Sequence, residues 1–379
     1  MQIFLKDINA IIKKITFVAG CLMLVVLPGD AQPFSGRGAQ HKLGIAAKTL
    51  APALCGLISP VARFANGGSS FKEGLASARG DCNENYGGPP LSIAFASNRD
   101  GNNEIYVMDP DGTNQVNVSE HAASDVAPDI SPNGRFIAFS SNRVTAENPE
   151  GDFEIFVMEF GKPTTAWQVT KNTALDGWPR WSRDGEMIVF ETREAAAPTT
   201  WEIYRYTLAE DKLVRLTTND VLDRFPEWSP DGELVIIRRE NDLYLIAAGD
   251  GADVARLTYD VPPAGSGFPA APGADQMASF SPNGKYLTWM SARNGYPSVF
   301  LMHIGQPEIQ VELTPRPVPA PTVFHSRAPG FSRNGQHIYF TRATPDTGGQ
   351  EDIFVMNADG TCVDRLTETE GFNMESAVR

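Results

Sequence analysis

The feature of this sequence that most constrains its fold is a four-residue turn pattern that recurs about every fifty residues. Each copy reads Ser, then Pro or Arg, then Asp or Asn, then Gly. Pro presets φ and Gly accepts positive φ, so each copy is expected to form a tight turn. The copies begin 51, 47, 52 and 51 residues apart, at Ser131, Ser182, Ser229, Ser281 and Ser332.

Short strand patterns surround each turn. A bulky apolar residue follows eight positions after each Ser, and a second strand follows in the form EIYVM, EIFVM, EIYRY, DLYLI, SVFLM or DIFVM. A third strand ends most units at Leu-Thr or Val-Thr, and the strand that leads into the Ser turn makes four. A four-stranded sheet has two apolar faces, which only neighbouring sheets can cover. The pattern therefore predicts an all-β fold, a six-bladed β-propeller of four-stranded antiparallel blades.

The first unit, which begins at Leu91, lacks a lead-in strand on its N-terminal side. The end of the chain begins another lead-in, with Glu375 where the earlier units have Asp. We therefore expect residues near 377–379 to supply the missing inner strand and to close the ring. The alternative is that the segment before Leu91 supplies it.

The N-terminus has the pattern of a bacterial export signal. Lys6, Lys13 and Lys14 precede the apolar run 15–27, and residues 29–31 offer a cleavage site between small residues. We therefore expect a signal peptide over 1–31, a small-residue-rich linker over 32–90, the propeller over 91–379, a periplasmic or secreted location, and no membrane span after cleavage. An uncleaved N-terminal anchor and lipidation at Cys21 remain alternatives.

Cysteines and net charge bound the partners. Cleavage would leave Cys55, Cys82 and Cys362, an odd number from which one disulfide can form, with no basis for choosing the pair. The net charge of −14 argues against nucleic acid, because phosphate binding needs clustered Lys and Arg. It favours a basic or apolar protein or peptide partner.

Several segments resemble one repeat family. The runs Asn98 to Gly101, Glu104 to Met108 and Asp111 to Thr113 resemble the WD40-like repeat of the C-terminal propeller of the TolB family. The resemblance covers residues 91–367 and implies a non-catalytic protein-interaction scaffold in the cell envelope. TolB proteins carry an α/β domain before the propeller, which residues 32–90 do not match.

Strand order assigns the loops to two faces. If the lead-in strand runs from face one to face two, the Ser turns lie on face two and the connections between blades lie on face one. The long connections, 144–152, 194–200, 259–274, 314–325 and 343–350, all fall on face one. Long loops on a rigid scaffold tend to carry recognition, so the sequence predicts face one as the binding face.

Two rings of charge recur at the face-one mouth of the channel. The arginines are predicted to pair with carboxylates between blades, and unpaired carboxylates to attract a cation or a basic segment. The carboxylates are Asp125, Asp176, Asp223, Asp275 and Glu375, and the arginines are Arg99, Arg143, Arg193, Arg239, Arg293 and Arg342.

Signatures of catalysis are missing from the sequence. It has no G-x-S-x-G, and its five histidines are scattered singly. We expect no enzymatic activity, no catalytic residues, and no cofactor beyond weakly bound calcium; the sequence names no metal site. The alternative function is a channel-centred, metal-dependent lyase or hydrolase acting on glycans, for which His121 and His325 near face one would be too few metal ligands.

Overall fold

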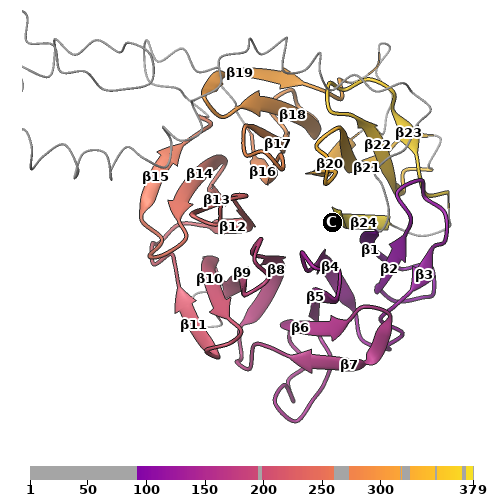
Figure 1. Cartoon of the computed structure of the whole chain (residues 1–379), viewed down its shortest axis with the longest axis vertical. Helices are drawn as coiled ribbons and strands as arrows, with labels where there is room; N and C mark the ends of the chain where they lie inside the picture. The colour runs from indigo at the N-terminus through magenta and orange to yellow at the C-terminus, as the bar shows by residue number, and fades with distance from the viewer. Residues whose placement is uncertain are drawn as a thin grey trace, which may run out of the picture. The chain divides into compact units, whose positions relative to one another are not determined.

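The computed structural model describes residues 92–194, 199–259, 273–315, 317, 325–345, 348–368 and 373–378. Across these residues, 24 strands form six four-stranded antiparallel sheets, which are arranged as blades around a central axis (Figure 1). The predicted all-β, six-bladed propeller is therefore confirmed. The predicted signal peptide and the linker over 32–90 lie outside the described residues. No helix among the described residues is long and apolar enough to cross a membrane.

Each blade is numbered from its inner strand outward. Blade 1 consists of β24 (Asn373–Val378), β1 (Ile93–Ser97), β2 (Glu104–Met108) and β3 (Val116–Asn117). Blade 2 consists of β4 (Asp125–Ile130), β5 (Phe136–Ser141), β6 (Glu154–Glu159) and β7 (Lys162–Gln168). Blade 3 consists of β8 (Leu175–Trp181), β9 (Met187–Arg193), β10 (Glu202–Thr207) and β11 (Lys212–Arg215).

The other three blades follow the same order. Blade 4 consists of β12 (Asp223–Trp228), β13 (Leu234–Arg239), β14 (Asp242–Ala247) and β15 (Asp253–Arg256). Blade 5 consists of β16 (Asp275–Phe280), β17 (Tyr286–Ser291), β18 (Ser298–His303) and β19 (Gln306–Glu312). Blade 6 consists of β20 (His325–Phe331), β21 (His337–Ala343), β22 (Glu351–Asn357) and β23 (Asp364–Arg365).

The ring is closed by the C-terminal segment, as the sequence predicts. Strand β24 is the inner strand of blade 1 and pairs antiparallel with β1, so that Val378 faces Ile93 and Asn373 faces Ser97. The closing strand begins earlier than the predicted 377–379. Closure between the two ends of the chain leaves no unpaired inner edge in blade 1, which is how propellers avoid an exposed strand edge.

The core lies between neighbouring blades. One cluster joins blade 1 to blade 2 and contains Ala94, Ile105, Ile137 and Phe139. Another joins blade 6 to blade 1, where Phe95 packs with residues of β21 and β22 such as Tyr339 and Ile353. These side chains are at most 5% exposed apart from a few at the cluster margins. Each blade is thus stabilised mainly by the burial of its two faces against its neighbours.

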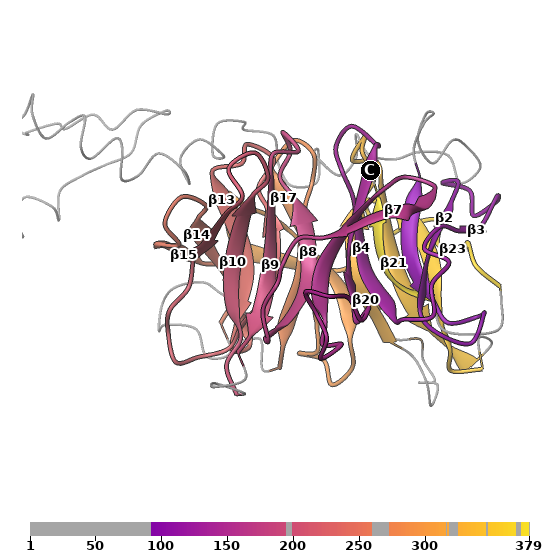
Figure 2. The same ribbon diagram turned by 90° about the horizontal axis from the view of Figure 1, so that it is seen from below.

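The Ser turns fold as expected and connect the inner strand of a blade to its second strand. In blade 4, the Ser229 hydroxyl donates to Asp231 Oδ1 (2.6 Å) and accepts the backbone N–H of Leu234 (2.9 Å). The N–H of Gly232, at a φ of 73°, donates to the Ser229 carbonyl (2.9 Å). Because all the blades are antiparallel, the Ser turns share one face, here called the Ser-turn face (Figure 2).

Candidate functional site: a cavity at the Ser-turn end of the channel

The inner strands share an irregularity that shapes the channel wall. In each of β4, β8, β12, β16 and β20 the register with the second strand shifts at the same place. A non-glycine residue adopts a positive φ of 49° to 56° at each shift. Such bulges re-aim side chains, and the conformation costs on the order of 1 kcal/mol for a residue other than Gly. The five residues are Ala127, Trp178, Phe225, Met277 and Ala328.

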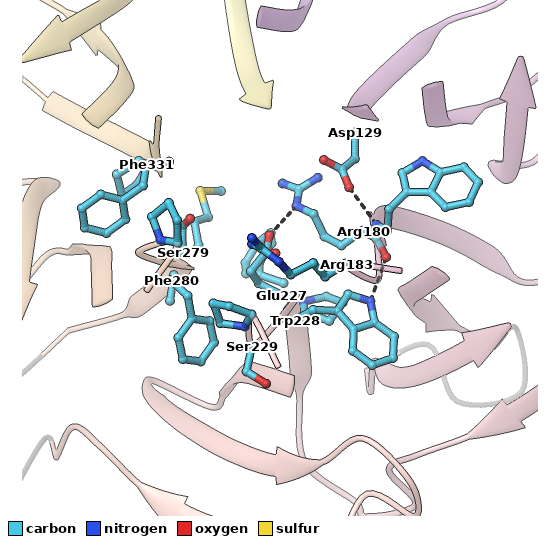
Figure 3. Close-up of a pocket in the computed structure, with 18 of the residues that line it drawn as sticks. Asp129, Arg180, Arg183, Glu227, Trp228, Ser229, Ser279, Phe280 and Phe331 are labelled. Carbon is cyan, nitrogen blue, oxygen red and sulfur yellow. Dashed lines mark hydrogen bonds and ion pairs between the residues drawn. The ribbon is translucent and has the colours of Figure 1, made fainter. Parts of the chain in front are cut away.

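Four of these bulge residues line a cavity of about 330 Å³ at the Ser-turn end of the channel (Figure 3). Its walls come from the inner strands of blades 3 to 6 and from the Ser turns, with Asp129 and Pro132 of blade 2 completing it. The volume is in the range of pockets that hold a few side chains or a small molecule. Trp178, Phe225, Met277 and Ala328 are the bulge residues in the wall.

One side of the cavity is aromatic. The rings of Trp178 and Phe225 meet edge to face, with centroids 4.8 Å apart and planes at 88°. Arg180 lies over the Trp178 ring at 5.6 Å and makes an ion pair with Glu227 at 3.1 Å, which links β8 to β12 (Figure 3). Half-buried aromatic rings beside an already neutralised ion pair form a surface that can bind an apolar side chain.

The cavity mouth carries two further arginines. Arg183 and Arg333 occupy the second position of the Ser turns of blades 3 and 6, and both are exposed. Neither guanidinium makes a hydrogen bond or an ion pair with any part of the chain that the structure describes. The site therefore combines an aromatic wall with positive charge at its entrance.

The predicted carboxylate ring lies elsewhere in the channel. Asp125, Asp176, Asp223 and Asp275 stand at the first or second position of their inner strands, at the opposite end from the Ser turns, and are 0–1% exposed. None lines the cavity. Their role in binding a partner or a cation stays a prediction, and the proposed function below rests on the other end of the channel.

The fifth predicted carboxylate needs a correction of register. Residue 373 faces Ser97 in β1 just as Asp125 faces Ser141 in β5, so Asn373, and not Glu375, is the equivalent of the aspartates. Glu375 falls instead at the bulge, between the paired residues Met374 and Ala377. The sequence comparison was misled because the lead-in strand of blade 1 is separated from the rest of its blade and no Ser turn fixes its alignment. The Glu375 side chain lies outside the described residues.

The predicted pairing of arginines between blades also needs correction. Arg143 binds Asp125 (2.6 Å), Arg239 binds Asp223 (2.8 Å) and Arg293 binds Asp275 (3.0 Å), and in each case both partners belong to one blade. The inner and second strands are adjacent at this end, so the arginine reaches the aspartate of its own hairpin first.

The remaining three arginines have other neighbours. Arg99 donates to Asn373 Oδ1 (2.7 Å), again within one blade, and Arg193 stacks on Trp201 at 5.2 Å. Arg342 donates to Ser326 (3.0 Å), and burial lowers its pKa to about 10.

Ion pairs between blades do exist, but they involve different residues. Arg224 of blade 4 binds Glu191 of blade 3 at 2.5 Å, and the same carboxylate accepts the backbone N–H of Phe225 (2.8 Å). The Arg180–Glu227 pair joins the same two blades nearer the cavity. The stiffest joint described by these contacts is therefore the one beneath the aromatic wall.

Metal and cysteine predictions are reached only in part. Among the described residues, no group of three or more His, Cys, Asp or Glu side chains is placed to hold a metal ion. Cys362 is disulfide-bonded, whereas the other three cysteines lie outside the described residues.

Sequence reasoning missed the cavity residues, although two signals for them were present. The exchange of Pro for Arg in two of the five Ser turns marks Arg183 and Arg333. The aromatic residues directly before Pro179 and Pro226 mark Trp178 and Phe225. Neither signal reveals that the four residues share one cavity, because they come from three different blades.

The fold and the channel cavity define the chain as a six-bladed β-propeller with a built binding cavity on its axis. No protein-family model matches the chain. A 43-residue segment is 46% identical to the Tol-Pal system protein TolB of Syntrophotalea carbinolica and 49% identical to that of Geobacter sulfurreducens. This segment is 11% of the chain and spans only about a tenth of the length of these curated relatives.

Solved structures extend the likeness to the whole ring. TolB from Acinetobacter baumannii has a TM-score of 0.59 at 21% identity, over 76% of this chain and 66% of that one. A putative TolB from Agrobacterium tumefaciens has a TM-score of 0.55 at 17% identity, over 77% of this chain and 99% of that one. At these identities the likeness shows the fold, and the structure is therefore a TolB-like six-bladed β-propeller.

Proposed function

We propose that the chain is an exported, non-catalytic propeller of the cell envelope that binds a segment of a partner protein in the cavity at its Ser-turn face. The observation that carries this proposal is the cavity itself, with the Trp178–Phe225 pair in its wall and two unpaired guanidinium groups at its mouth. Aromatic and arginine side chains in a concave site are the residue types that most often dominate protein interfaces. A general interaction role agrees with the TolB-like fold.

Two features support export to an oxidising compartment. The first is the signal-like N-terminus, with basic residues before a short apolar run. The second is the disulfide bond of Cys362, since disulfides persist in the periplasm and outside the cell and are rare in the cytosol. Fusing residues 1–31 to an alkaline phosphatase without its own signal tests this directly. Active phosphatase would support export, and an inactive fusion in cells that express it well would contradict it.

Site-specific photo-crosslinking in the native envelope tests the binding role. A photoreactive phenylalanine analogue replaces Met277, which lies half-buried in the cavity wall, or Leu213, which is 49% exposed on the outer strand β11. We expect a discrete adduct of one partner protein from position 277 and none from position 213.

Two outcomes would contradict the proposed function. One is the absence of a discrete adduct at 277, at the neighbouring wall position 178 and at 328. The other is the same adducts from 277 and from 213, because a channel-directed interaction cannot label the outer edge of a blade.

A further inference from the structure

Two of the five Ser turns carry an arginine that the turn itself does not require. Pro stands at the second position in blades 2, 4 and 5, where it presets φ. Arg183 and Arg333 replace it in blades 3 and 6, yet the turns are the same. The closing N–H···O bond measures 2.9 Å at Gly185 and 2.8 Å at Gly335, against 2.9 Å at Gly232 of a Pro-containing turn. A role outside the turn therefore has to account for the two arginines.

Both arginines face the cavity entrance without an internal partner. They are exposed, they line the cavity, and neither is bonded to another part of the described structure. Their blades stand three places apart in a ring of six, so the two guanidinium groups approach the mouth from opposite sides (Figure 1). A ligand that crosses the mouth in an extended conformation would contact both.

The other charged groups of the cavity are already paired. Arg180 and Glu227 neutralise each other at 3.1 Å. Asp129 is 2% exposed and accepts the backbone N–H of Trp181 (2.7 Å). The lining therefore holds three guanidinium groups against two carboxylates, in a chain whose net charge is −14. Local charge at the cavity thus opposes the charge of the whole molecule, and long-range steering by the acidic surface does not describe what the cavity itself prefers.

We propose that the cavity selects an acidic peptide segment. In this arrangement a carboxylate of the ligand binds Arg183 and Arg333, and an apolar side chain next to it packs on the Trp178–Phe225 pair and Met277. Guanidinium groups form the strongest of the common hydrogen bonds to carboxylates, and the aromatic wall supplies the apolar contact. The inference rests on the proposed function and replaces the basic partner suggested by net charge with an acidic one.

Selection from a random peptide library displayed on phage tests the proposal without knowledge of the natural partner. The bait is the full mature chain, compared with a double variant R183P/R333P and with R135Q as control. The double variant keeps the residue that the sister turns carry, so it should fold and unfold like the wild type. Arg135 lies on the same face outside the cavity, 3.9 Å from Glu159, and its loss removes one charge without touching the site.

We expect wild type and R135Q to enrich peptides in which Asp or Glu adjoins an aromatic or aliphatic residue. Synthetic peptides of this sequence should bind R183P/R333P at least about tenfold more weakly, since the lost bonds are charge-assisted. Replacing their acidic residue by Asn or Gln should weaken binding to wild type by a similar factor and should have little effect on binding to the double variant.

The outcomes separate this inference from the proposed function. Enriched peptides that compete for the Met277 crosslink but show no acidic preference and bind R183P/R333P unchanged would overturn the inference and leave the binding role standing. If no enriched peptide competes at Met277 and no partner crosslinks there, both are overturned.

Discussion

The joint between blades 2 and 3 should make the protein less stable as pH rises from 5 to 8. Glu154 and Asp176 lie there fully buried and adjacent, and neither binds an arginine. At the other joints a cation is present, as in the pairs Glu202–Arg215 (3.1 Å) and Asp352–Arg365 (2.6 Å). Burial, reinforced at Glu154 by the neighbouring Asp176 carboxyl, raises the pKa of both groups.

The sign of the effect follows from the direction of the pKa shifts. A carboxyl whose pKa is higher in the folded state than in the unfolded state contributes its full stability at low pH, where it is protonated in both states. That stability is lost as pH rises through the folded-state pKa, because the folded chain must then hold a buried charge or keep a proton that the unfolded chain releases. Each tenfold difference in proton affinity is worth about 1.4 kcal/mol, so the pair costs on the order of 2 kcal/mol at pH 8.

Asp176→Asn is the perturbation that isolates this pair. The amide keeps an oxygen for the hydrogen bonds that Thr192 and Asn172 donate (both 2.7 Å) and gains an N–H that can donate to Glu154. Its free energy of unfolding at pH 8 should rise by roughly 1–2 kcal/mol above wild type, with a much smaller gain at pH 5. Urea unfolding followed by tryptophan fluorescence at pH 5, 6, 7 and 8 measures the difference.

The equivalent residue of the neighbouring blade is the control with the opposite expected sign. Asp125→Asn leaves the guanidinium of Arg143, only 8% exposed, without its carboxylate. We expect a loss of about 3 kcal/mol at every pH from 5 to 8. The reasoning is refuted if Asp176→Asn keeps the pH dependence of the wild type, or if it destabilises the protein at pH 8 as much as Asp125→Asn does.

Three further predictions concern the fold. Ala328→Gly, at a φ of 49°, should raise the free energy of unfolding by about 0.5–1 kcal/mol, whereas Ala138→Gly in a regular strand should lower it; equal effects in urea unfolding would contradict the strain assigned to the bulge. Ser229→Ala should cost about 1–3 kcal/mol because the buried N–H of Leu234 loses its acceptor, and a change below 0.3 kcal/mol would count against that bond. Deleting residues 373–379 should abolish the single cooperative thermal transition in circular dichroism, and an unchanged transition would disprove closure by β24.

The ring could be predicted from the sequence because the repeat is visible at several levels at once. The Ser turn, the strand before it and the EIYVM-type strand after it recur together, so local pattern and global fold agree. Closure by the C-terminal strand was also predictable, because a blade short of one strand has to obtain it from the other end of the chain. The exact register of that strand was not, since no turn ties Asn373 to β1.

The site was harder to predict because it depends on departures from the repeat. The charge ring drew attention since it recurs in most blades, yet recurrence is what a structural hairpin contact such as Arg143–Asp125 produces. A binding cavity on a pseudo-symmetric scaffold is made by the residues that differ between blades, here Arg183, Arg333, Trp178 and Phe225. Their convergence depends on bulges whose positive φ values sequence patterns do not encode.

The environment of Trp178 during partner binding tests the central claim most directly. The protein has six tryptophans, and in 5-fluorotryptophan-labelled protein the resonance of Trp178 can be assigned by its loss in Trp178→Phe. When the partner recovered by crosslinking is added, the account predicts that the Trp178 resonance shifts or broadens while that of Trp289, 0% exposed in the core, stays in place. Saturating binding of the partner with an unmoved Trp178 resonance would show that the partner does not use the cavity and would contradict the account.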